Sequence, residues 1–242
     1  MENLKYKTYR LIWSGLDLLF PPQCGGCGRP GTRWCNACQN GVIMLNGIVC
    51  GVCGLPQDKA GICSACLVSK PRFHSLKAWA VFKEPLQSAL RKLKYRRDFS
   101  MGDAIAAAMM PFVKSLEWQI DLVVPVPLGK QRMHERGYNQ VAMIAQPLAL
   151  GLGWQYLPKA LARRKETRSQ VGLSREQRHE NVAGAFQATP GVKGKSILIM
   201  DDVSTTGSTL SSGAEALFAA GARDVYALTV ARALPHHDLR RV

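Results

Sequence analysis

The sequence has few acidic and aromatic residues, and it contains no long apolar run. Its 242 residues include 17 Asp and Glu against 32 Lys and Arg, which gives a formal net charge of +15, and aromatic residues make up 7%. No apolar run reaches the roughly 18 to 20 residues that cross a bilayer, so we expect no membrane span. The surplus of cations favours acidic partners, namely polyphosphorylated small molecules, nucleic acid or both.

Cysteine is absent after residue 66, and all eight cysteines of the chain fall in Cys-x-x-Cys pairs. The pairs are formed by Cys24, Cys27, Cys35, Cys38, Cys50, Cys53, Cys63 and Cys66. Two residues between cysteines let both sulfurs reach one tetrahedral ion. Secreted disulfide scaffolds seldom place every cysteine in such a pair, so the pattern predicts bound zinc.

The way in which the pairs share metal ions follows less directly from the spacing. The simplest arrangement is sequential, with Cys24 to Cys38 on one Zn²⁺ and Cys50 to Cys66 on a second, forming a double zinc ribbon. A crossed arrangement, in which each ion takes alternate pairs, fits the same spacing and stays open. In both arrangements four thiolates leave no position for a substrate, so we expect structural zinc.

The N-terminal stretch from Leu4 to Phe20 has apolar residues at near-helical spacing with basic residues between them. We expect a helix that packs on its own domain, and a helix on a membrane surface is the alternative. The stretch lacks a small-residue cleavage site, which predicts a cytoplasmic protein. After Cys66, the connector Lys70-Pro71-Arg72 predicts a boundary between a domain of residues 1–70 and one of residues 71–242.

Residues 197–209 combine a strand, two carboxylates and a turn that suits a phosphate group. The apolar residues Ile197 to Met200 predict a buried strand of a parallel sheet, which places the next residues at the strand's carboxyl end. The turn offers five hydroxyl groups, and Gly207 lets backbone N–H groups approach an anion at a helix start. Because Asp201 and Asp202 can accept hydrogen bonds from sugar hydroxyls, the segment predicts a site for a sugar phosphate.

A helix and a second strand are expected after this motif. Leu210 to Phe218 place apolar residues on one helical face, Gly221 can end the helix, and Val225 to Val230 predicts the next strand. A short Asp-x-Thr-Gly sequence is by itself more often a capped turn. Here it lies between a strand and a helix, which favours a ligand site in a βαβ unit.

Basic segments flank this unit in the sequence. A strand is expected from Leu76 to Phe82, followed by a helix from Pro85 to Tyr95. The basic end of that helix, which includes Lys94, is either a solvated terminus or an anion-binding group. The run Lys159 to Arg178 predicts a basic loop that closes over a bound ligand, and a solvated loop is the alternative.

A third basic segment follows a short strand from Asp121 to Val126, which ends in two prolines. The expected turn carries Lys130, Arg132 and Arg136, and a helix opens at Gly137 and runs to about Leu150. Cations at a strand end before a helix N-terminus can contact pyrophosphate oxygens.

Together with the cysteine pairs, several motifs resemble those of the competence protein F (ComF) family over essentially the whole chain. They are Leu93-Lys94-Tyr95, Val124-Pro125-Val126-Pro127-Leu128 with Arg136-Gly137-Tyr138-Asn139-Gln140, Thr167 to Asn181, and the Asp201-Asp202 motif. The last of these is similar to the phosphoribosyl-pyrophosphate (PRPP) motif of type I phosphoribosyltransferases. The resemblance implies an α/β fold with a type I phosphoribosyltransferase-like central parallel sheet and flanking helices, plus a small N-terminal Cys-rich zinc-ribbon domain.

The resemblance also implies a role for each segment. Asp201 and Asp202 would contact the ribose hydroxyls, and the residues that would hold the 5-phosphate are Val203, Ser204, Thr205, Thr206, Gly207, Ser208 and Thr209. The residues that would contact pyrophosphate, directly or from the covering loop, are Lys130, Arg132, Arg136, Arg168 and Arg178. Mg²⁺ would arrive with PRPP rather than in a protein cage.

Two functions are compatible with this resemblance. The first is a role in natural transformation, in DNA uptake and the handling of imported single-stranded DNA, with PRPP or another phosphoribosyl ligand bound and a competence helicase as a further partner. The alternative is an active phosphoribosyltransferase of nucleotide metabolism with an unknown acceptor, which displaces pyrophosphate at the anomeric carbon of ribose. No aromatic residue interleaves with the run Lys159 to Arg178, so DNA binding would rest mainly on phosphate contacts. The sequence leaves the oligomeric state open.

Overall fold

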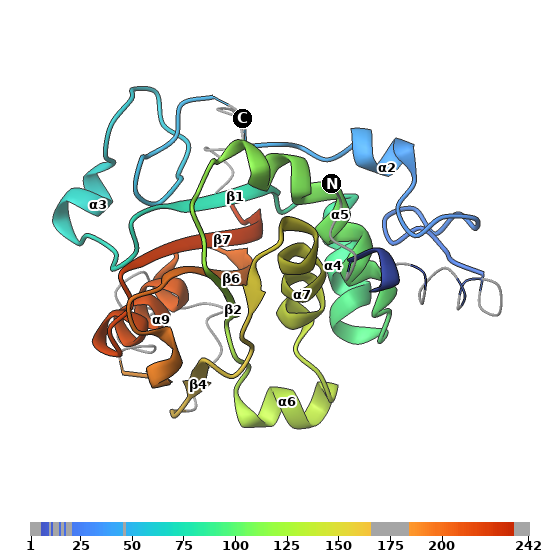
Figure 1. The fold of residues 1–242 in the computed structure, drawn as a ribbon. Coiled ribbons are helices and arrows are strands. Elements are labelled where there is room, and N and C mark those ends of the chain that lie inside the picture. Colours follow the sequence, from blue (N-terminus) through green and yellow to red (C-terminus); the bar gives the residue numbers. More distant parts are fainter. Residues whose placement is uncertain are drawn as a thin grey trace.

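The computed structural model describes residues 21–45, 47–165 and 184–234, together with residues 6–9, 11, 15 and 17. Its centre is a five-stranded sheet in which every neighbouring pair of strands is parallel (Figure 1). The strands in spatial order are β1 (Leu76–Val81), β7 (Asp224–Arg232), β6 (Ser196–Ser204), β2 (Leu122–Pro125) and β3 (Gln155–Tyr156). The expected α/β fold with a central parallel sheet is confirmed.

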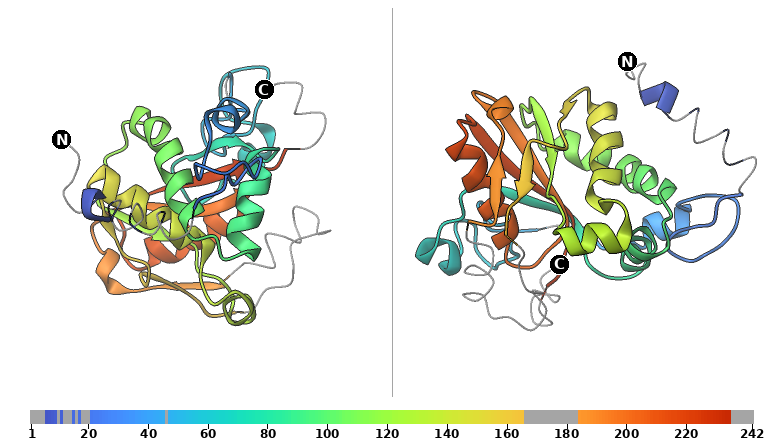
Figure 2. Two further views of the ribbon diagram at one scale, coloured as in Figure 1. Left: turned by 90° about the vertical axis from the view of Figure 1, so that its right-hand side faces the viewer. Right: turned by 90° about the horizontal axis from the view of Figure 1, so that it is seen from below.

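Helices cover both faces of the sheet (Figures 1 and 2). Helices α4 (Leu86–Tyr95), α5 (Ser100–Ser115) and α7 (Gln140–Leu152) pack on one face, and α9 (Ser208–Ala219) packs on the other. Successive side chains of β6 point to opposite faces of the sheet, so the strand contributes to both hydrophobic cores. Leu198 and Met200 belong to the core under α4, α5 and α7, whereas Ile197 and Ile199 belong to the core under α9.

Helices α5 and α7 approach each other closely because of one glycine. A Cβ atom built on Gly102 of α5 would lie 2.4 Å from the carbonyl oxygen of Met143 on α7. A side chain at this position would therefore push the two helices apart. None of the helices in the described ranges is long and apolar enough to cross a membrane.

Two of the expected elements differ in the structure. The cations after β2 lie on a separate helix, α6 (Lys130–Arg136), instead of a turn, and Gly137 ends it with a φ of +76°. Helix α7 then begins at Gln140, where the side chain of Asn139 accepts a hydrogen bond from the N–H of Val141 at 3.0 Å.

The start of the expected basic loop is also a strand. Strand β4 (Leu161–Arg163) pairs in antiparallel fashion with β5 (Phe186–Ala188), which is followed by the short 3-10 helix η1 (Pro190–Val192). Residues 166–183, which make up the rest of that run and the segment after it, lie outside the described residues.

The cysteine-rich segment runs along the sheet and contributes to both cores. It carries two short helices, α2 (Asn36–Asn40) and α3 (Ser64–Val68), which lie on opposite sides of the molecule (Figure 1). Between them, Met44 forms an antiparallel bridge with Ala80 of β1. Because this segment shares its cores with the sheet, the boundary near residue 70 stays a prediction.

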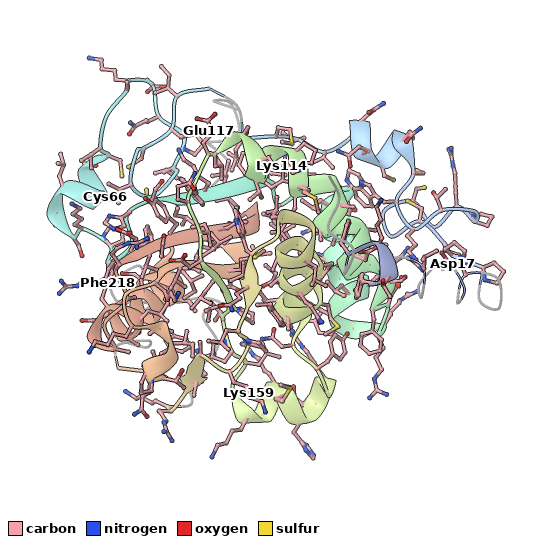
Figure 3. The ribbon with its side chains drawn as sticks, viewed as in Figure 1. Asp17, Cys66, Lys114, Glu117, Lys159 and Phe218 are labelled. Carbon is pink, nitrogen blue, oxygen red and sulfur yellow. The ribbon has the colours of Figure 1, made fainter. Side chains whose placement is uncertain are left out.

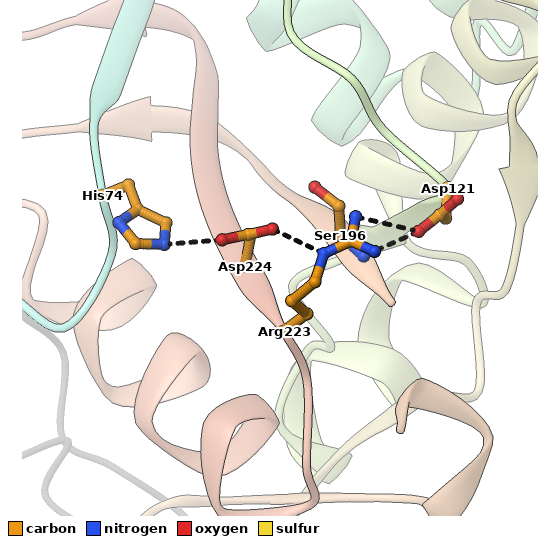
Figure 4. A network of polar contacts seen from close by, with 5 residues as sticks. All are labelled: His74, Asp121, Ser196, Arg223 and Asp224. Atoms are coloured by element: carbon orange, nitrogen blue, oxygen red, sulfur yellow. Dashed lines mark hydrogen bonds and ion pairs between the residues drawn. The ribbon is translucent and has the colours of Figure 1, made fainter. Parts of the chain in front are cut away.

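A polar network ties together the amino ends of four strands, β1, β7, β6 and β2 (Figure 4). His74 Nε2 lies 3.1 Å from Asp224 Oδ1, and Arg223 Nε donates to Asp224 Oδ2 at 2.9 Å. Arg223 also lies 3.7 Å from Asp121 Oδ2, which accepts a hydrogen bond from the N–H of Ser196 at 2.8 Å. The network is half-exposed and lies at the edge opposite to the carboxyl ends of the strands, so we assign it a structural role.

Candidate functional site

The two predicted carboxylates lie at the carboxyl end of β6, but on the strand and not in a loop after it. Strand β6 continues to Ser204 because it pairs with β7 as far as Ser204 and Arg232, whereas its pairing with β2 ends at Met200. The expectation that the strand ends at Met200 was therefore wrong. Past Met200, the edge of β6 that faces β2 is free of ladder hydrogen bonds among the described strands, which opens that edge to a ligand.

Lys94, at the end of α4, forms an ion pair with Asp202. Its Nζ atom contacts Asp202 Oδ2, and the side chains of Lys94 and Asp202 are 19% and 7% exposed. Asp201 accepts a hydrogen bond through Oδ1 from the N–H of Asp202 at 2.8 Å. The site thus contains two adjacent carboxylates and one cation, all largely shielded from water.

This arrangement separates the acidities of the two carboxyl groups. Burial and then the neighbouring negative charge of Asp202 raise the pKa of Asp201 well above its usual value. Burial also opposes ionisation of Asp202, but the Lys94 ammonium group outweighs it and lowers the Asp202 pKa. Asp202 is therefore the charged member of the pair, and Asp201 is the member that accepts a proton more readily.

The hydroxyl-rich loop after β6 turns at a buried glycine. Gly207 has a φ of +81° and stands at the N-cap of α9, so backbone N–H groups of the first helical turn follow directly. Thr206 Oγ1 and Ser208 Oγ lie 2.7 Å apart, and the N–H of Ser208 donates to Thr206 Oγ1 at 3.3 Å. Such a turn can present hydroxyl and N–H donors to an anion.

The end of this loop that follows β6 is fixed by two residues of β7. Ser204 Oγ lies 3.3 Å from Thr229 Oγ1, and the carbonyl oxygen of Thr205 accepts a hydrogen bond from Arg232 Nη2 at 3.1 Å. Both β7 side chains are buried. The loop that was predicted to hold a phosphate is thus held on its strand side, with Thr205 exposed at its tip.

The structure places only one of the three cations of α6 against the motif on α4. The guanidinium group of Arg136 lies over the ring of Tyr95, 5.1 Å from its centroid, and donates to Gln140 Oε1 at 2.7 Å. Tyr138 donates a hydrogen bond to the carbonyl oxygen of Leu93. Lys130 and Arg132 are exposed on α6, and Arg168 and Arg178 lie outside the described residues.

The eight cysteines form two groups of four, in the sequential arrangement. Within each group all sulfur atoms lie within 4.8 Å of one another, which excludes the crossed pairing. The Sγ–Sγ distances are 3.6 Å for Cys24 and Cys35, 3.8 Å for Cys27 and Cys35, and 3.7 Å for Cys53 and Cys63. Zn–S bonds of about 2.3 Å in a tetrahedron place sulfurs about 3.8 Å apart, so the two groups fit Zn²⁺.

Backbone N–H groups also favour the thiolate form of one cysteine in each cluster, which is the form that binds metal. The N–H of Cys35 points at Cys24 Sγ at 3.5 Å, and the N–H of Cys63 points at Cys50 Sγ at 3.3 Å. Burial raises the pKa of the Cys24 and Cys50 thiols, but these and neighbouring N–H groups outweigh it and lower the pKa of both to about 6. The second cluster lies beside α3, and Figure 3 shows Cys66 on the same side of the molecule as Phe218 of α9.

Two residues at the site were not among the predicted site residues. Lys94 was noted only as part of a basic helix end, and its pairing with Asp202 depends on how α4 packs on the sheet. Arg232 follows an ordinary strand pattern, and nothing in its sequence context indicates that its side chain is buried. The Leu93-Lys94-Tyr95 motif is the one sequence signal that pointed to Lys94.

Comparison with known protein families finds one match in the cysteine-rich segment and another in the part of the chain that contains β6 and α9. The family model described as a double zinc ribbon domain matches residues 15–67, and the model described as a phosphoribosyl transferase domain matches residues 139–238. An adenine phosphoribosyltransferase structure from Thermoanaerobacter pseudethanolicus is similar over 56% of this chain and 82% of its own, at 14% identity and a TM-score of 0.34.

Two curated relatives match nearly the whole chain. DNA utilization protein YhgH from Salmonella typhimurium is 32% identical over 227 residues, which cover 90% of this chain and 100% of the relative. Competence protein F from Haemophilus influenzae is 29% identical over 208 residues, which cover 82% of this chain and 90% of the relative. The chain therefore belongs to the family of DNA utilization protein YhgH and competence protein F, with a double zinc ribbon and a phosphoribosyltransferase-like domain.

Proposed function

We propose that Asp201 to Thr209 bind a phosphoribosyl ligand, PRPP with Mg²⁺, and that the protein uses this site in the handling of single-stranded DNA. The observation that carries the ligand proposal is the continuity of the segment. A shielded carboxylate pair at the end of β6 leads within a few residues into a left-handed glycine at the N-terminus of α9. Sugar hydroxyls and a phosphate group need these two kinds of partner at about this separation.

Each part of the ligand has a matching group in the chain. The carboxylates of Asp201 and Asp202 would accept hydrogen bonds from the ribose hydroxyls, and Thr206, Ser208 and the first N–H groups of α9 would donate to the 5-phosphate. Lys94 supplies a cation beside the carboxylates. Mg²⁺, which prefers phosphate, carboxylate and water oxygens, would neutralise charge on the pyrophosphate group when bound.

A thermal-shift experiment tests the ligand proposal. Ligand at about 100 times its Kd adds about 2.7 kcal/mol to the free energy of unfolding, which raises the Tm by several degrees in a chain of this size. We expect this rise with PRPP and Mg²⁺, and a smaller rise with ribose 5-phosphate or pyrophosphate alone, because each is only part of the ligand.

Two variants make the experiment specific to the site. Asp201→Asn should lose the response to PRPP, whereas Asp224→Asn, which changes a carboxylate at the opposite edge of the sheet, should keep it. The ligand proposal is wrong if PRPP with Mg²⁺ gives no shift in the wild type, or if both variants respond equally.

The DNA part of the proposal rests on the relatives' names and on one surface of the chain. At the end of α4, Tyr95 is 71% exposed beneath the guanidinium group of Arg136, and Arg96 and Arg97 next to it are exposed. An exposed aromatic ring among cations can stack a base while the cations contact the phosphates. The run of residues 159–178 contains no aromatic residue, so we propose that Tyr95 supplies the stacking contact and that the cations supply the phosphate contacts.

Fluorescence anisotropy with a labelled oligothymidylate tests this surface. We expect affinity to fall steeply between about 50 and 200 mM salt. Tyr95→Ala should weaken binding by about 5- to 150-fold, in line with roughly 1 to 3 kcal/mol per stacked base, whereas Tyr95→Phe should bind like the wild type. Affinity that does not depend on salt, or that is unchanged in Tyr95→Ala, would contradict the proposal.

A further inference from the structure

Arg232, the last residue of β7, is a buried cation without a carboxylate partner among the described residues. Its side chain belongs to a residue that is 2% exposed, and no ion pair links it to an acidic residue in the described parts of the chain. A guanidinium group stays protonated at every ordinary pH. Burying such a charge is costly unless hydrogen bonds and a nearby negative charge compensate it, so its surroundings are informative.

The two ends of the Arg232 guanidinium group bind two different parts of the protein. Nη1 donates to the carbonyl oxygen of Cys53, a residue of the second cysteine cluster. Nη2 donates to the carbonyl oxygen of Thr205, in the loop proposed to hold the phosphate. One buried side chain therefore connects a metal-binding knuckle with the ligand loop.

The packing around Arg232 joins the same two parts. The N–H of Leu76 donates to the carbonyl oxygen of Val52 at 2.7 Å, and a Cβ atom on Gly54 would lie 2.5 Å from the carbonyl oxygen of Leu76. On the other side, Leu76 Cδ2 lies 3.1 Å from the position of a Cβ atom on Gly207. The knuckle thus packs against Leu76 at the start of β1, and the Leu76 side chain packs against Gly207 in the turn of the loop.

The second cluster can also supply the missing negative charge. Four thiolates around one Zn²⁺ leave a double negative charge, and Cys53 is the ligand whose carbonyl oxygen binds Arg232. Without the metal, the knuckle would lose the bonds that fix its backbone, including the carbonyl group of Cys53 that binds Arg232.

The first cluster has no comparable connection in the described structure. Its residues pack on α4 and α5, where a Cβ atom on Gly26 would meet Pro85 at 2.8 Å and one on Gly25 would meet Met101 at 2.3 Å. Lys92 Nζ on α4 donates to the carbonyl oxygen of Cys24 at 2.9 Å, and Arg33, between the two cysteine pairs, lies 4.0 Å from Asp103 Oδ2 on α5. Loss of zinc from the first cluster therefore serves as a control for effects of zinc loss that do not depend on Arg232.

We propose that Arg232 couples zinc occupancy of the second cluster to the conformation of the loop from Ser204 to Thr209, so that loss of this zinc weakens ligand binding. The inference rests on the proposed function for its ligand, and it adds a regulatory input to that site. Arg232 acts as a positioning residue, since it holds the loop through the backbone of Thr205 and forms no ion pair with a carboxylate in the described part of the chain.

The experiment compares Cys66→Ser with Cys38→Ser, because both cysteines are buried and each is the last ligand of its cluster. Zinc content, hydrogen exchange of residues 204–209 and the Kd for PRPP with Mg²⁺ are measured for each variant. We expect each variant to retain one zinc. Cys66→Ser should exchange faster in the loop and bind at least 10-fold more weakly, whereas Cys38→Ser should stay within about threefold of the wild type in both.

Variants of Arg232 complete the test and replace Cys66→Ser if that chain does not fold. Arg232→Met should keep both zinc ions and still speed hydrogen exchange in the loop. Arg232→Lys keeps the charge but lacks the two-pronged guanidinium group, so its exchange rate should lie between those of Arg232→Met and the wild type. Combining Arg232→Met with Cys66→Ser should add no further loosening. Equal effects of Cys66→Ser and Cys38→Ser, or an unchanged loop in Arg232→Met, would overturn the coupling.

The exchange measurement also separates this inference from the proposed function. If the wild type binds no PRPP, the ligand proposal fails, but faster loop exchange in Cys66→Ser alone still supports the coupling. If the wild type binds PRPP and the loop is equally protected in all variants, the coupling fails and the ligand proposal stands.

Discussion

Replacing Lys94 with methionine should destabilise the protein through Asp202. The two side chains are 19% and 7% exposed, so the pair is mostly shielded from water and salt. Removing one member of a buried pair leaves an uncompensated charge and typically costs about 3 to 5 kcal/mol, against about 0 to 1 kcal/mol for an exposed pair. We expect Lys94→Met to lose about 3 kcal/mol, which corresponds to a Tm decrease of about 6 to 12 °C.

The double variant distinguishes the ion pair from simple packing. Lys94→Met with Asp202→Asn removes both charges of the pair, so neither member is left without its partner. Its free energy of unfolding should lie within about 1 kcal/mol of the wild type. With Lys94→Met costing about 3 kcal/mol, the coupling energy in the double-mutant cycle is then about 2 kcal/mol plus the cost of Asp202→Asn alone. Urea denaturation measured for the wild type, Asp202→Asn, Lys94→Met and the double variant provides the four values.

The pH dependence gives a second readout. In the wild type, Lys94 lowers the Asp202 pKa below 3.8, so the stabilising contribution of this group is complete above about pH 3.8 and is lost as the pH falls through the lowered pKa. In Lys94→Met, the burial that raises the Asp202 pKa remains, and the ammonium group that outweighs it is gone. The deficit of the variant should therefore be largest at pH 8 and smaller at pH 5. A deficit below about 1 kcal/mol that is equal at both values would refute the reasoning.

Three further predictions concern the loop and the clusters. Burial and Asp202 raise the pKa of Asp201, so its ionisation costs stability as the pH rises through that raised pKa. Asp201→Asn should therefore raise the Tm at pH 7 by a few degrees and lose this advantage near pH 4, as measured by calorimetry. Both Gly207 and Gly153 have positive φ, but of these two only Gly207 would bring a Cβ atom within 4 Å of a neighbour, at 3.1 Å. In urea denaturation, Gly207→Ala should therefore lose more free energy of unfolding than Gly153→Ala. Equal losses of free energy would contradict this. Metal analysis should find two zinc ions per chain, and a value of one would contradict the two-cluster structure.

Local patterns in the sequence were enough to predict much of the fold and of the metal sites. The strand from Leu76 and the helix after Gly207 are set by apolar periodicity and by glycine, which act over a few residues. The sequential grouping of the cysteines followed from spacing as the simplest arrangement, and the structure has this grouping. No prediction covered α5, an Ala- and Met-rich segment whose helix depends on packing against α7.

The contacts that shape the candidate site could not be predicted in the same way. Lys94 reaches Asp202, and Arg232 reaches Cys53, across separations of about 100 residues or more, and only the assembled sheet brings these residues together. The end of β6 was misplaced for the same reason, because its length is set by pairing with β7 rather than by its own composition. Local sequence indicates which groups a site contains, and tertiary packing decides which of them meet.

Isothermal titration of the wild type with PRPP and Mg²⁺, beside the Asp201→Ala, Asp202→Ala double variant, tests the central claim most directly. We expect the wild type to bind with measurable heat and the double variant to give none, because the ribose hydroxyls lose both acceptors at the end of β6. No heat in the wild type, or equal binding by the double variant, would contradict the assignment of this segment as a phosphoribosyl site.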